Sequence, residues 1–288
     1  MSSENIDSEL KRAVRDHWER ETCGTRYGDS EDSRRYFEEI EAARYEFEPY
    51  IPSFACFEEG RGRRVLEIGV GAGSDFANWV RAGAQATGLD LTEAAIETTR
   101  DHLDAFGIDG NSYRLETGDA EGLRFEDGSF EIVYSWGVLH HSPDTARAFS
   151  EVCRVLEPEG VFRGMVYHVP SWGGWLVWAM QSLLRGKPFR SVKRSVFEHL
   201  ESPGTKAYRI AECRRLLTQA GFADVRLHTR LNPGDLLLIR LGEKYQHPLH
   251  RLLYRVYPRW LVRLLGDRFG LNLLIEARKT TTPGTEPL

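Results

Sequence analysis

A glycine-rich turn that directly follows an apolar segment is the part of the sequence best suited to bind a ligand. Residues 65–73 read Val-Leu-Glu-Ile-Gly-Val-Gly-Ala-Gly. Glycines allow a backbone to approach a ligand closely, and the first turn of a following helix offers unpaired N–H groups. Nicotinamide and flavin enzymes carry G-x-G-x-x-G at this place, but here the third glycine comes one residue early and Ser74 takes its usual position. Because the acidic Glu67 would repel a pyrophosphate, the motif predicts a site for a cationic ligand.

Two further acidic residues follow the next two apolar segments. Asp90 ends the segment Thr87-Gly88-Leu89-Asp90-Leu91, where a carboxylate can accept both hydroxyls of a ribose. Asp119, in Gly118-Asp119-Ala120, follows the third segment, where it can accept a hydrogen bond from an adenine amino group. S-adenosylmethionine combines these groups with an ammonium and a sulfonium. Three acids at consecutive strand ends therefore predict one site for this cofactor.

Alternating strands and helices must position these residues. Apolar runs bounded by Gly and Asp alternate with helical periodicity from about residue 64, which is typical of β–α units around a parallel sheet. Strands are expected at residues 64–69, 86–90, 112–117, 130–135 and 160–167, and a terminal pair at 223–231 and 270–279. Helices are expected at 72–82, at 92–106 with Thr92 as its N-cap, and at 210–220.

The chain of 288 residues is long enough for one large α/β domain with additions. We expect a helical leader or lid at 1–60 and the main domain at 61–279, interrupted by insertions at about 169–206 and 232–268. Residues 280–288 are rich in Thr and Pro and are expected to be disordered.

Several motifs between residues 64 and 168 resemble the class I, Rossmann-like methyltransferases that use S-adenosylmethionine, in particular a bacterial group with ubiquinone-, menaquinone- and natural-product-type members. They are, in chain order, residues 67–73, Asp90, residues 118–120, 125–133, 138–144 and 151–160. The resemblance implies a doubly wound, seven-stranded, mostly parallel sheet with an antiparallel last strand. It also implies that the cofactor lies at the carboxyl ends of the first strands and contacts Glu67, Gly69, Gly71, Gly73, Asp90, Leu91, Asp119, Ala120 and Ser135.

The leader is similar to the N-terminal helices of a subset of bacterial natural-product methyltransferases, through residues 17–25 and 44–50. In such enzymes a leader folds over the cofactor, which implies that Tyr27, Arg44 and Tyr45 close on its methionine carboxylate or on the substrate. The alternative is a helix packed outside the sheet.

His140 and His141 are the candidate catalytic bases, because they follow the fourth expected strand and histidine titrates near neutrality. One of them could instead cap a helix or pack. His168, at the end of the fifth strand, is a third candidate. Trp136 is expected to line the site, and Trp172 belongs to an apolar stripe that either roofs a substrate pocket or forms core.

The two halves of the chain differ in charge. Residues 1–168 hold 18 Lys and Arg against 34 Asp and Glu, whereas residues 169–288 hold 20 against 9. In the second insertion, basic residues recur every four positions and are His247, Arg251, Arg255, Arg259 and Arg263. A basic amphipathic element at 246–266 is typical of a solvated lid, a grip on an anionic substrate, or a peripheral membrane contact.

Other features exclude several classes of protein. The acidic first half argues against a nucleic-acid surface, and the longest apolar run, 175–180, is far too short to cross a membrane. Four scattered cysteines without a Cys-x-x-Cys pair predict reduced thiols, no disulfide and no metal site. We therefore expect a cytoplasmic location.

The sequence as a whole predicts a methyltransferase for a bulky, partly apolar small molecule or peptide, methylated at a hydroxyl or carboxylate oxygen. Two alternatives stay open at this stage. The enzyme could methylate nitrogen or carbon of a natural-product intermediate, or the chain could be a catalytically silent subunit that binds the cofactor and a partner.

Overall fold

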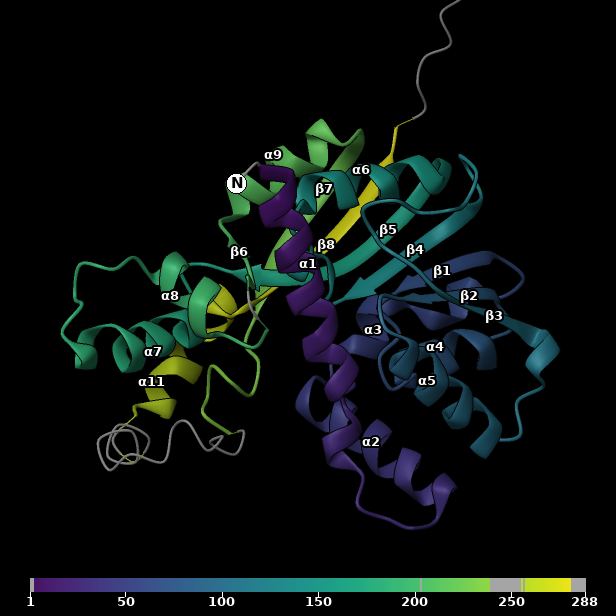
Figure 1. Ribbon diagram of the computed structural model, residues 1–288, viewed down its shortest axis with the longest axis horizontal. Coiled ribbons are helices and arrows are strands. Elements are labelled where there is room, and N and C mark those ends of the chain that lie inside the picture. The colour runs from purple at the N-terminus through teal and green to yellow at the C-terminus, as the bar shows by residue number, and fades with distance from the viewer. Residues whose placement is uncertain (1–2, 203, 239–254, 256, 281–288) are drawn as a thin grey trace, which may run out of the picture.

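The computed structural model describes residues 3–202, 204–238, 255 and 257–280. Its centre is one eight-stranded sheet whose main path runs β3-β2-β1-β4-β5-β8-β7, with β6 paired to β5 (Figure 1). The strands are β1 Arg64–Ile68, β2 Gln85–Asp90, β3 Tyr113–Thr117, β4 Phe130–Trp136, β5 Leu156–His168, β6 Ala207–Tyr208, β7 Phe222–Arg230 and β8 Asn272–Lys279.

Strands β1 to β6 pair in parallel, and β8 lies antiparallel between β5 and β7. The predicted fold class is confirmed, because the seven expected strands form this path and the last one is antiparallel. The sheet contains one strand more than predicted. A two-residue β6 was missed because so short a segment carries no readable alternation.

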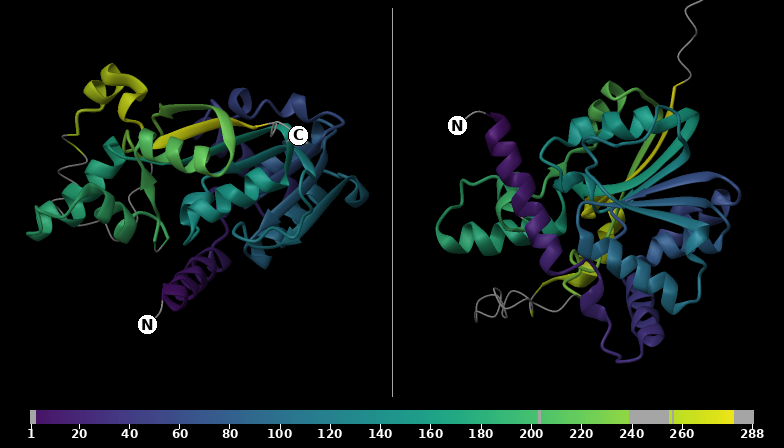
Figure 2. Two further views of the ribbon diagram at one scale, coloured as in Figure 1. Left: turned by 90° about the horizontal axis from the view of Figure 1, so that it is seen from above. Right: turned by 45° about the vertical axis from the view of Figure 1, so that its right-hand side comes forward.

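Helices cover both faces of the sheet (Figure 2). The helices of the main domain are α4 Ser74–Arg81, α5 Glu93–Ala105, α6 Thr145–Val155 and α9 Ile210–Gln219. One core cluster joins α6 and α9 to the sheet through Phe149 and Leu217, and a second joins α4 and α5 to it through Trp79 and Leu103. Thr92 caps α5 as predicted, since its hydroxyl accepts the Ala95 N–H.

The N-terminal segment adds helices α1 Ser3–Arg20, α2 Ser33–Phe47 and α3 Ile51–Ala55. In Figure 1 helix α1 passes in front of the region between the sheet and a separate group of helices, and in the left view of Figure 2 it projects away from both. Among the helices that the structure describes, none combines the length and the apolar character needed to span a bilayer.

The two insertions form that group, which we call the insertion lobe: α7 Trp172–Gln181 and α8 Val192–His199 from the first, and α11 Arg259–Leu265 from the second. Leu176 and Met180 of α7 share a small core with Leu237 and Tyr257. The buried Asp235 carboxylate accepts the N–H groups of Gly173 and Leu271 at 2.7 and 2.8 Å, which joins both insertions to the start of β8. Within the basic ladder, His247 and Arg251 lie outside the described residues, as do 281–288 of the expected disordered tail.

Candidate active site

The glycine-rich turn lies at the carboxyl end of β1, as predicted from its sequence. A Cβ on Gly69 would lie 2.1 Å from a Val138 side-chain carbon, and its φ is +84°, so only glycine fits there. Glu67 is 3% exposed, and among the described residues its Oε2 has no hydrogen-bond partner. Burial, reinforced by Asp75, raises the pKa of Glu67 well above its usual value. A buried carboxylate in this state gains free energy from a cationic ligand.

Asp90 and Asp119 end neighbouring strands, so the sheet brings the three predicted acids to one edge. Asp90 accepts the Gly71 N–H at 3.2 Å and the Thr92 N–H at 3.0 Å, which fixes its carboxylate beside the glycine-rich turn. Leu91 follows it directly, and Ala120 packs against the main core. Asp119 accepts a 2.6 Å hydrogen bond from Lys11 of α1.

The leader lies over this edge of the sheet. A Cβ on Gly71 would lie 3.4 Å from the Cys23 carbonyl oxygen, and a Cβ on Gly24 would lie 3.4 Å from the Ala72 Cβ. Together with the Lys11–Asp119 ion pair, these contacts place α1 and the following turn along the three acids. Any molecule that hydrogen-bonds Asp119 there competes with Lys11.

Arg44 and Tyr45 both bond to Asp75, a buried residue in the first turn of α4 that sequence reasoning missed. The Arg44 Nε and the Tyr45 hydroxyl donate to Asp75 Oδ1 at 2.8 and 2.9 Å, and the Tyr134 hydroxyl donates to Oδ2 at 2.8 Å. The sequence offered only one indication of Asp75, which is that it follows the glycine-rich turn. Tyr27 does not join this network, because its ring packs on Phe47 at 5.2 Å.

Ser135 and Trp136 end β4 and point toward different partners. The buried Ser135 hydroxyl donates to the Ile68 carbonyl at 2.9 Å, which holds β4 beside the end of β1. The Trp136 indole donates to Glu48 Oε2 at 2.9 Å. Burial raises the pKa of Glu48, a second residue that sequence reasoning did not select.

His140 and His141 form a buried pair in the 3-10 turn Leu139–His141 after β4. The His140 ring lies 4.2 Å from both the His141 ring and the Tyr167 ring. Trp18 of α1 contacts the His141 ring edge-on at 5.5 Å. Burial lowers the pKa of His140 well below its usual range and, with Lys206, lowers that of His141 to about 3. Both rings are therefore neutral at neutral pH.

His168 and Trp172 take other positions. Successive strand residues face opposite sides of a sheet, so His168 points away from the side on which Tyr167 meets His140. Its Nδ1 lies 3.1 Å from the Gly270 carbonyl oxygen. The Trp172 ring packs against Trp175 and Phe269 within the insertion lobe.

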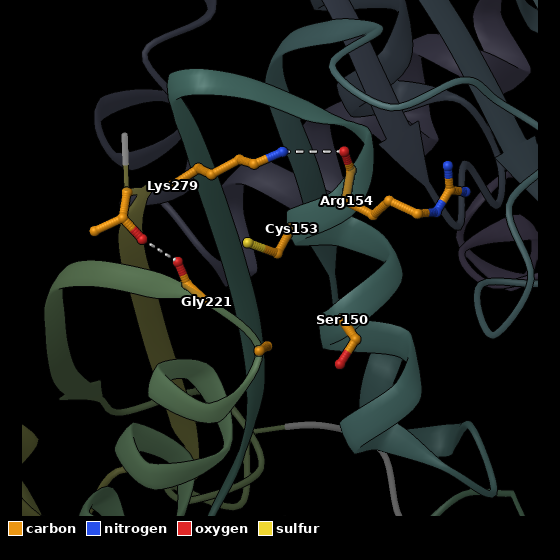
Figure 3. Close-up of a pocket in the computed structure, with 7 residues that line it drawn as sticks. Ser150, Cys153, Arg154, Gly221 and Lys279 are labelled. Carbon is orange, nitrogen blue, oxygen red and sulfur yellow. Dashed lines mark hydrogen bonds between the residues drawn. The ribbon is translucent and has the colours of Figure 1, made fainter. Parts of the chain in front are cut away.

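The described part of the protein has hollows in its surface, of which two bear on the location of the site. One of about 270 Å³ lies between the end of α6, the turn after α9 and the end of β8, where Lys279 donates to the Arg154 carbonyl (Figure 3). Because β8 is antiparallel, this hollow is at the opposite end of the sheet from the three acids. The other, of about 250 Å³, is lined by Gln181, Arg185, Glu198, His199 and Glu201. Glu201 Oε2 also lies 3.5 Å from His141 Nε2.

Residues 66–163 match the family model described as "Methyltransferase domain". The chain is 33% identical over 107 residues to the uncharacterized methyltransferase YcgJ of Bacillus subtilis. This alignment covers 37% of this chain and 42% of that protein. It is 39% identical over 108 residues to phthiotriol/phenolphthiotriol dimycocerosates methyltransferase 1 of Mycobacterium ulcerans, covering 37% of this chain and 38% of that protein. The chain thus spans about two fifths of the length of these two relatives.

Solved structures extend the likeness of the fold. A geranyl diphosphate C-methyltransferase from Streptomyces coelicolor, in complex with Mg²⁺, geranyl diphosphate and S-adenosyl-L-homocysteine, aligns with a TM-score of 0.62 at 15% identity, covering 94% of this chain and 98% of that one. An S-adenosylmethionine-dependent methyltransferase from Mesorhizobium loti aligns with a TM-score of 0.51 at 21% identity, covering 80% of this chain and 97% of that one.

Proposed function

We propose that this chain, which contains a class I methyltransferase domain using S-adenosylmethionine, methylates an oxygen of a bulky, partly apolar acceptor. The observation that supports the cofactor best is the buried Glu67 carboxylate with its unpartnered Oε2. The ammonium of the methionine group would satisfy it. Asp90 would accept the ribose hydroxyls, and Asp119 with Ala120 would face the adenine.

S-adenosylmethionine supplies an electrophilic methyl group on a sulfonium. The protein must hold an acceptor oxygen about 3 Å from that carbon, in line with the bond that breaks, and exclude water. His140, His141 and Tyr167 form a buried cluster after β4 and β5, and we propose that the acceptor binds against it. A hydroxyl needs its proton removed as it attacks. Both ring nitrogens of His140 and Nε2 of His141 have no hydrogen-bond partner among the described residues, so a neutral imidazole is available to accept that proton.

Incubation with methyl-labelled S-adenosylmethionine and a metabolite extract, followed by mass analysis of the labelled product, tests this proposal. A methyl ether or ester is the expected product. A new C–CH₃ bond would instead support carbon methylation, the second candidate, which the name of the geranyl diphosphate enzyme favours. Cofactor binding without any labelled product would favour a silent binding subunit.

We expect Asp90→Ala to weaken S-adenosylmethionine binding by about 1.5–3 kcal/mol, the usual scale for a hydrogen bond to a charged group. The loss of the 3.2 Å bond that orders Gly71 acts in the same direction. Isothermal titration calorimetry measures the effect. Asp101→Ala, which removes an exposed carboxylate on α5, is the matched control and should bind normally. An unchanged affinity in Asp90→Ala would remove this residue from the ribose role.

Binding of S-adenosylmethionine should release protons and weaken as the pH falls. The raised pKa of free Glu67 drops when an ammonium pairs with it, so affinity is lost as the pH falls through the free-state pKa. Calorimetry in two buffers of different ionisation enthalpy should detect the released proton. In Glu67→Gln the heat should no longer depend on the buffer. A wild-type heat that is the same in both buffers would contradict this account of Glu67.

Exposed apolar side chains on the insertion lobe favour an acceptor that is apolar or located in a membrane. Trp260 and Leu264 of α11 are 70% and 74% exposed. The residues that face inward are Val262, which is fully buried, and Arg259, which donates to the Leu236 carbonyl at 2.9 Å. Of the three alternatives for the basic element at 246–266, these exposed apolar side chains favour a peripheral membrane contact over a solvated lid. We propose that its exposed apolar side chains contact lipid, with Arg255 and Arg263 beside them.

We expect the wild-type protein to sediment with vesicles of phosphatidylglycerol and phosphatidylcholine. The double variant Trp260→Ser, Leu264→Ser should lose at least about tenfold in partitioning, because each large apolar side chain contributes about 1.5–3 kcal/mol when buried. Ile210→Ser, which changes an exposed apolar residue on α9, is the control. If the double variant and the control bound to the vesicles equally well, the proposal that α11 contacts lipid would be wrong.

A further inference from the structure

One cluster of side chains beside the acceptor space has the composition of a metal site. His140, His141 and Glu201 each place one ligand atom within 4.8 Å of the other two. The two histidines come from the turn after β4, and Glu201 follows α8 in the first insertion. Two imidazoles and one carboxylate are a set that binds Zn²⁺ or Fe²⁺ while leaving coordination positions open.

Neighbouring hydroxyls hold the His141 ring in place. Its Nδ1 lies 2.8 Å from the Ser202 hydroxyl and 3.1 Å from the Thr205 hydroxyl, and both residues are buried. Its Nε2 lies 3.5 Å from Glu201 Oε2. In the tautomer with the proton on Nδ1, both hydroxyls can accept that proton and the lone pair on Nε2 faces Glu201. Metal-binding histidines are commonly oriented by such a partner on the other nitrogen.

His140 and Glu201 complete the cluster. Within the described part of the chain, neither ring nitrogen of the fully buried His140 has a hydrogen-bond partner, which is unfavourable for a buried polar group unless a ligand binds it. Tyr167 donates to Glu201 Oε1 at 2.6 Å and leaves Oε2 on the histidine side. Glu201 has a φ of +51°, in the left-handed region that few non-glycine residues adopt.

We propose that His140, His141 and Glu201 bind one divalent transition-metal ion, whose open positions take the acceptor oxygen. The proposal rests on the proposed function for the role of the ion, but the binding itself does not. Zn–N bonds are about 2.0–2.1 Å long, so ligand atoms lie about 3–4 Å apart around an ion. Binding would draw the half-exposed Glu201 side chain slightly inward from the neighbouring hollow.

The chemistry follows from Lewis acidity. A hydroxyl bound to the ion loses its proton to water at a lower pH than a free hydroxyl does. Its oxygen then forms a bond to the methyl carbon while the C–S bond breaks, and the electron pair of that bond goes to sulfur, giving S-adenosylhomocysteine. No electron is gained or lost by the metal.

The test is Zn²⁺ titration of the untagged full chain after treatment with a chelator, followed by calorimetry, with Co²⁺ absorption as a second readout. We expect one ion per chain, at least a hundredfold weaker binding in His140→Ala, His141→Ala and Glu201→Gln, and unchanged binding in His228→Ala. Wild-type protein that binds no ion, or that binds it no better than the variants, would overturn the proposal.

Thr205→Val provides a test in which all three ligands are retained. The variant removes one of the two hydroxyls that contact Nδ1, and with Ser202→Ala added it removes both, which should weaken Zn²⁺ binding about 10–100-fold. Added Zn²⁺ should raise the melting temperature of the wild type and much less that of Glu201→Gln. Full turnover by metal-free protein would overturn the role in transfer, whereas site-specific Zn²⁺ binding without any methylated product would overturn the proposed function alone.

Discussion

Replacing Asp75 by alanine should lower the free energy of unfolding by about 3–5 kcal/mol, the scale for removing one partner of a buried ion pair. The Asp75 side chain is 2% exposed and receives hydrogen bonds from Arg44, Tyr45 and Tyr134. Its loss leaves a guanidinium and two hydroxyls without their acceptor in the same buried space. Urea denaturation followed by circular dichroism measures the change.

An exposed ion pair provides the matched control for Asp75. Arg34 and Glu38 of α2 pair at 3.1 Å with side chains that are 62% and 52% exposed. Glu38→Ala should change stability by about 0.5 kcal/mol or less, because solvent screens such pairs. If Asp75→Ala cost no more than Glu38→Ala, the network around Asp75 would not be what holds α2 against α4.

Turnover should fall by about 10²–10⁴-fold in His141→Ala, while the affinity for S-adenosylmethionine stays the same. The reason is position: the His141 ring lies on the acceptor side, and the proposed cofactor residues Glu67 and Asp90 end other strands. This loss is expected whether the histidine accepts a proton or binds an ion, since either role acts on the attacking oxygen. Single-turnover kinetics at saturating cofactor measure the effect.

His228→Ala is the control for this variant, because His228 lies on β7 and packs against Phe54. Its turnover should be close to that of the wild type. Near-normal turnover in both His140→Ala and His141→Ala would indicate an acceptor that is already ionised, such as a carboxylate, and would remove the need for either histidine.

The sequence was sufficient to predict features that depend on local pattern. The strand ends at Asp90 and Thr117 and the N-cap at Thr92 agree with the structure, because apolar runs, turn residues and caps act over a few positions. The parallel order of β1 to β3 follows from the β–α alternation, and it brings Glu67, Asp90 and Asp119 to one edge without any further information.

Features that depend on contacts between distant segments could not be predicted. Asp75 was visible as an acid, but its partners Arg44 and Tyr134 belong to other elements. Glu201 reaches His141 only through the packing of the first insertion. The exposure of Trp260 could not be predicted, because a basic ladder at helical spacing gives two faces but not which face the protein covers.

The contacts of the buried Asp235 make the two insertions structurally dependent on each other. Its carboxylate accepts N–H groups from Gly173 in one insertion and from Leu271 beyond the other, and Leu176 and Met180 pack on Leu237 and Tyr257 across them. A chimera that grafts only one insertion from a relative would leave an unmatched carboxylate and half of a small core. We therefore expect that an exchange of insertions between relatives, made to change the acceptor, gives a folded protein only when both insertions are exchanged together.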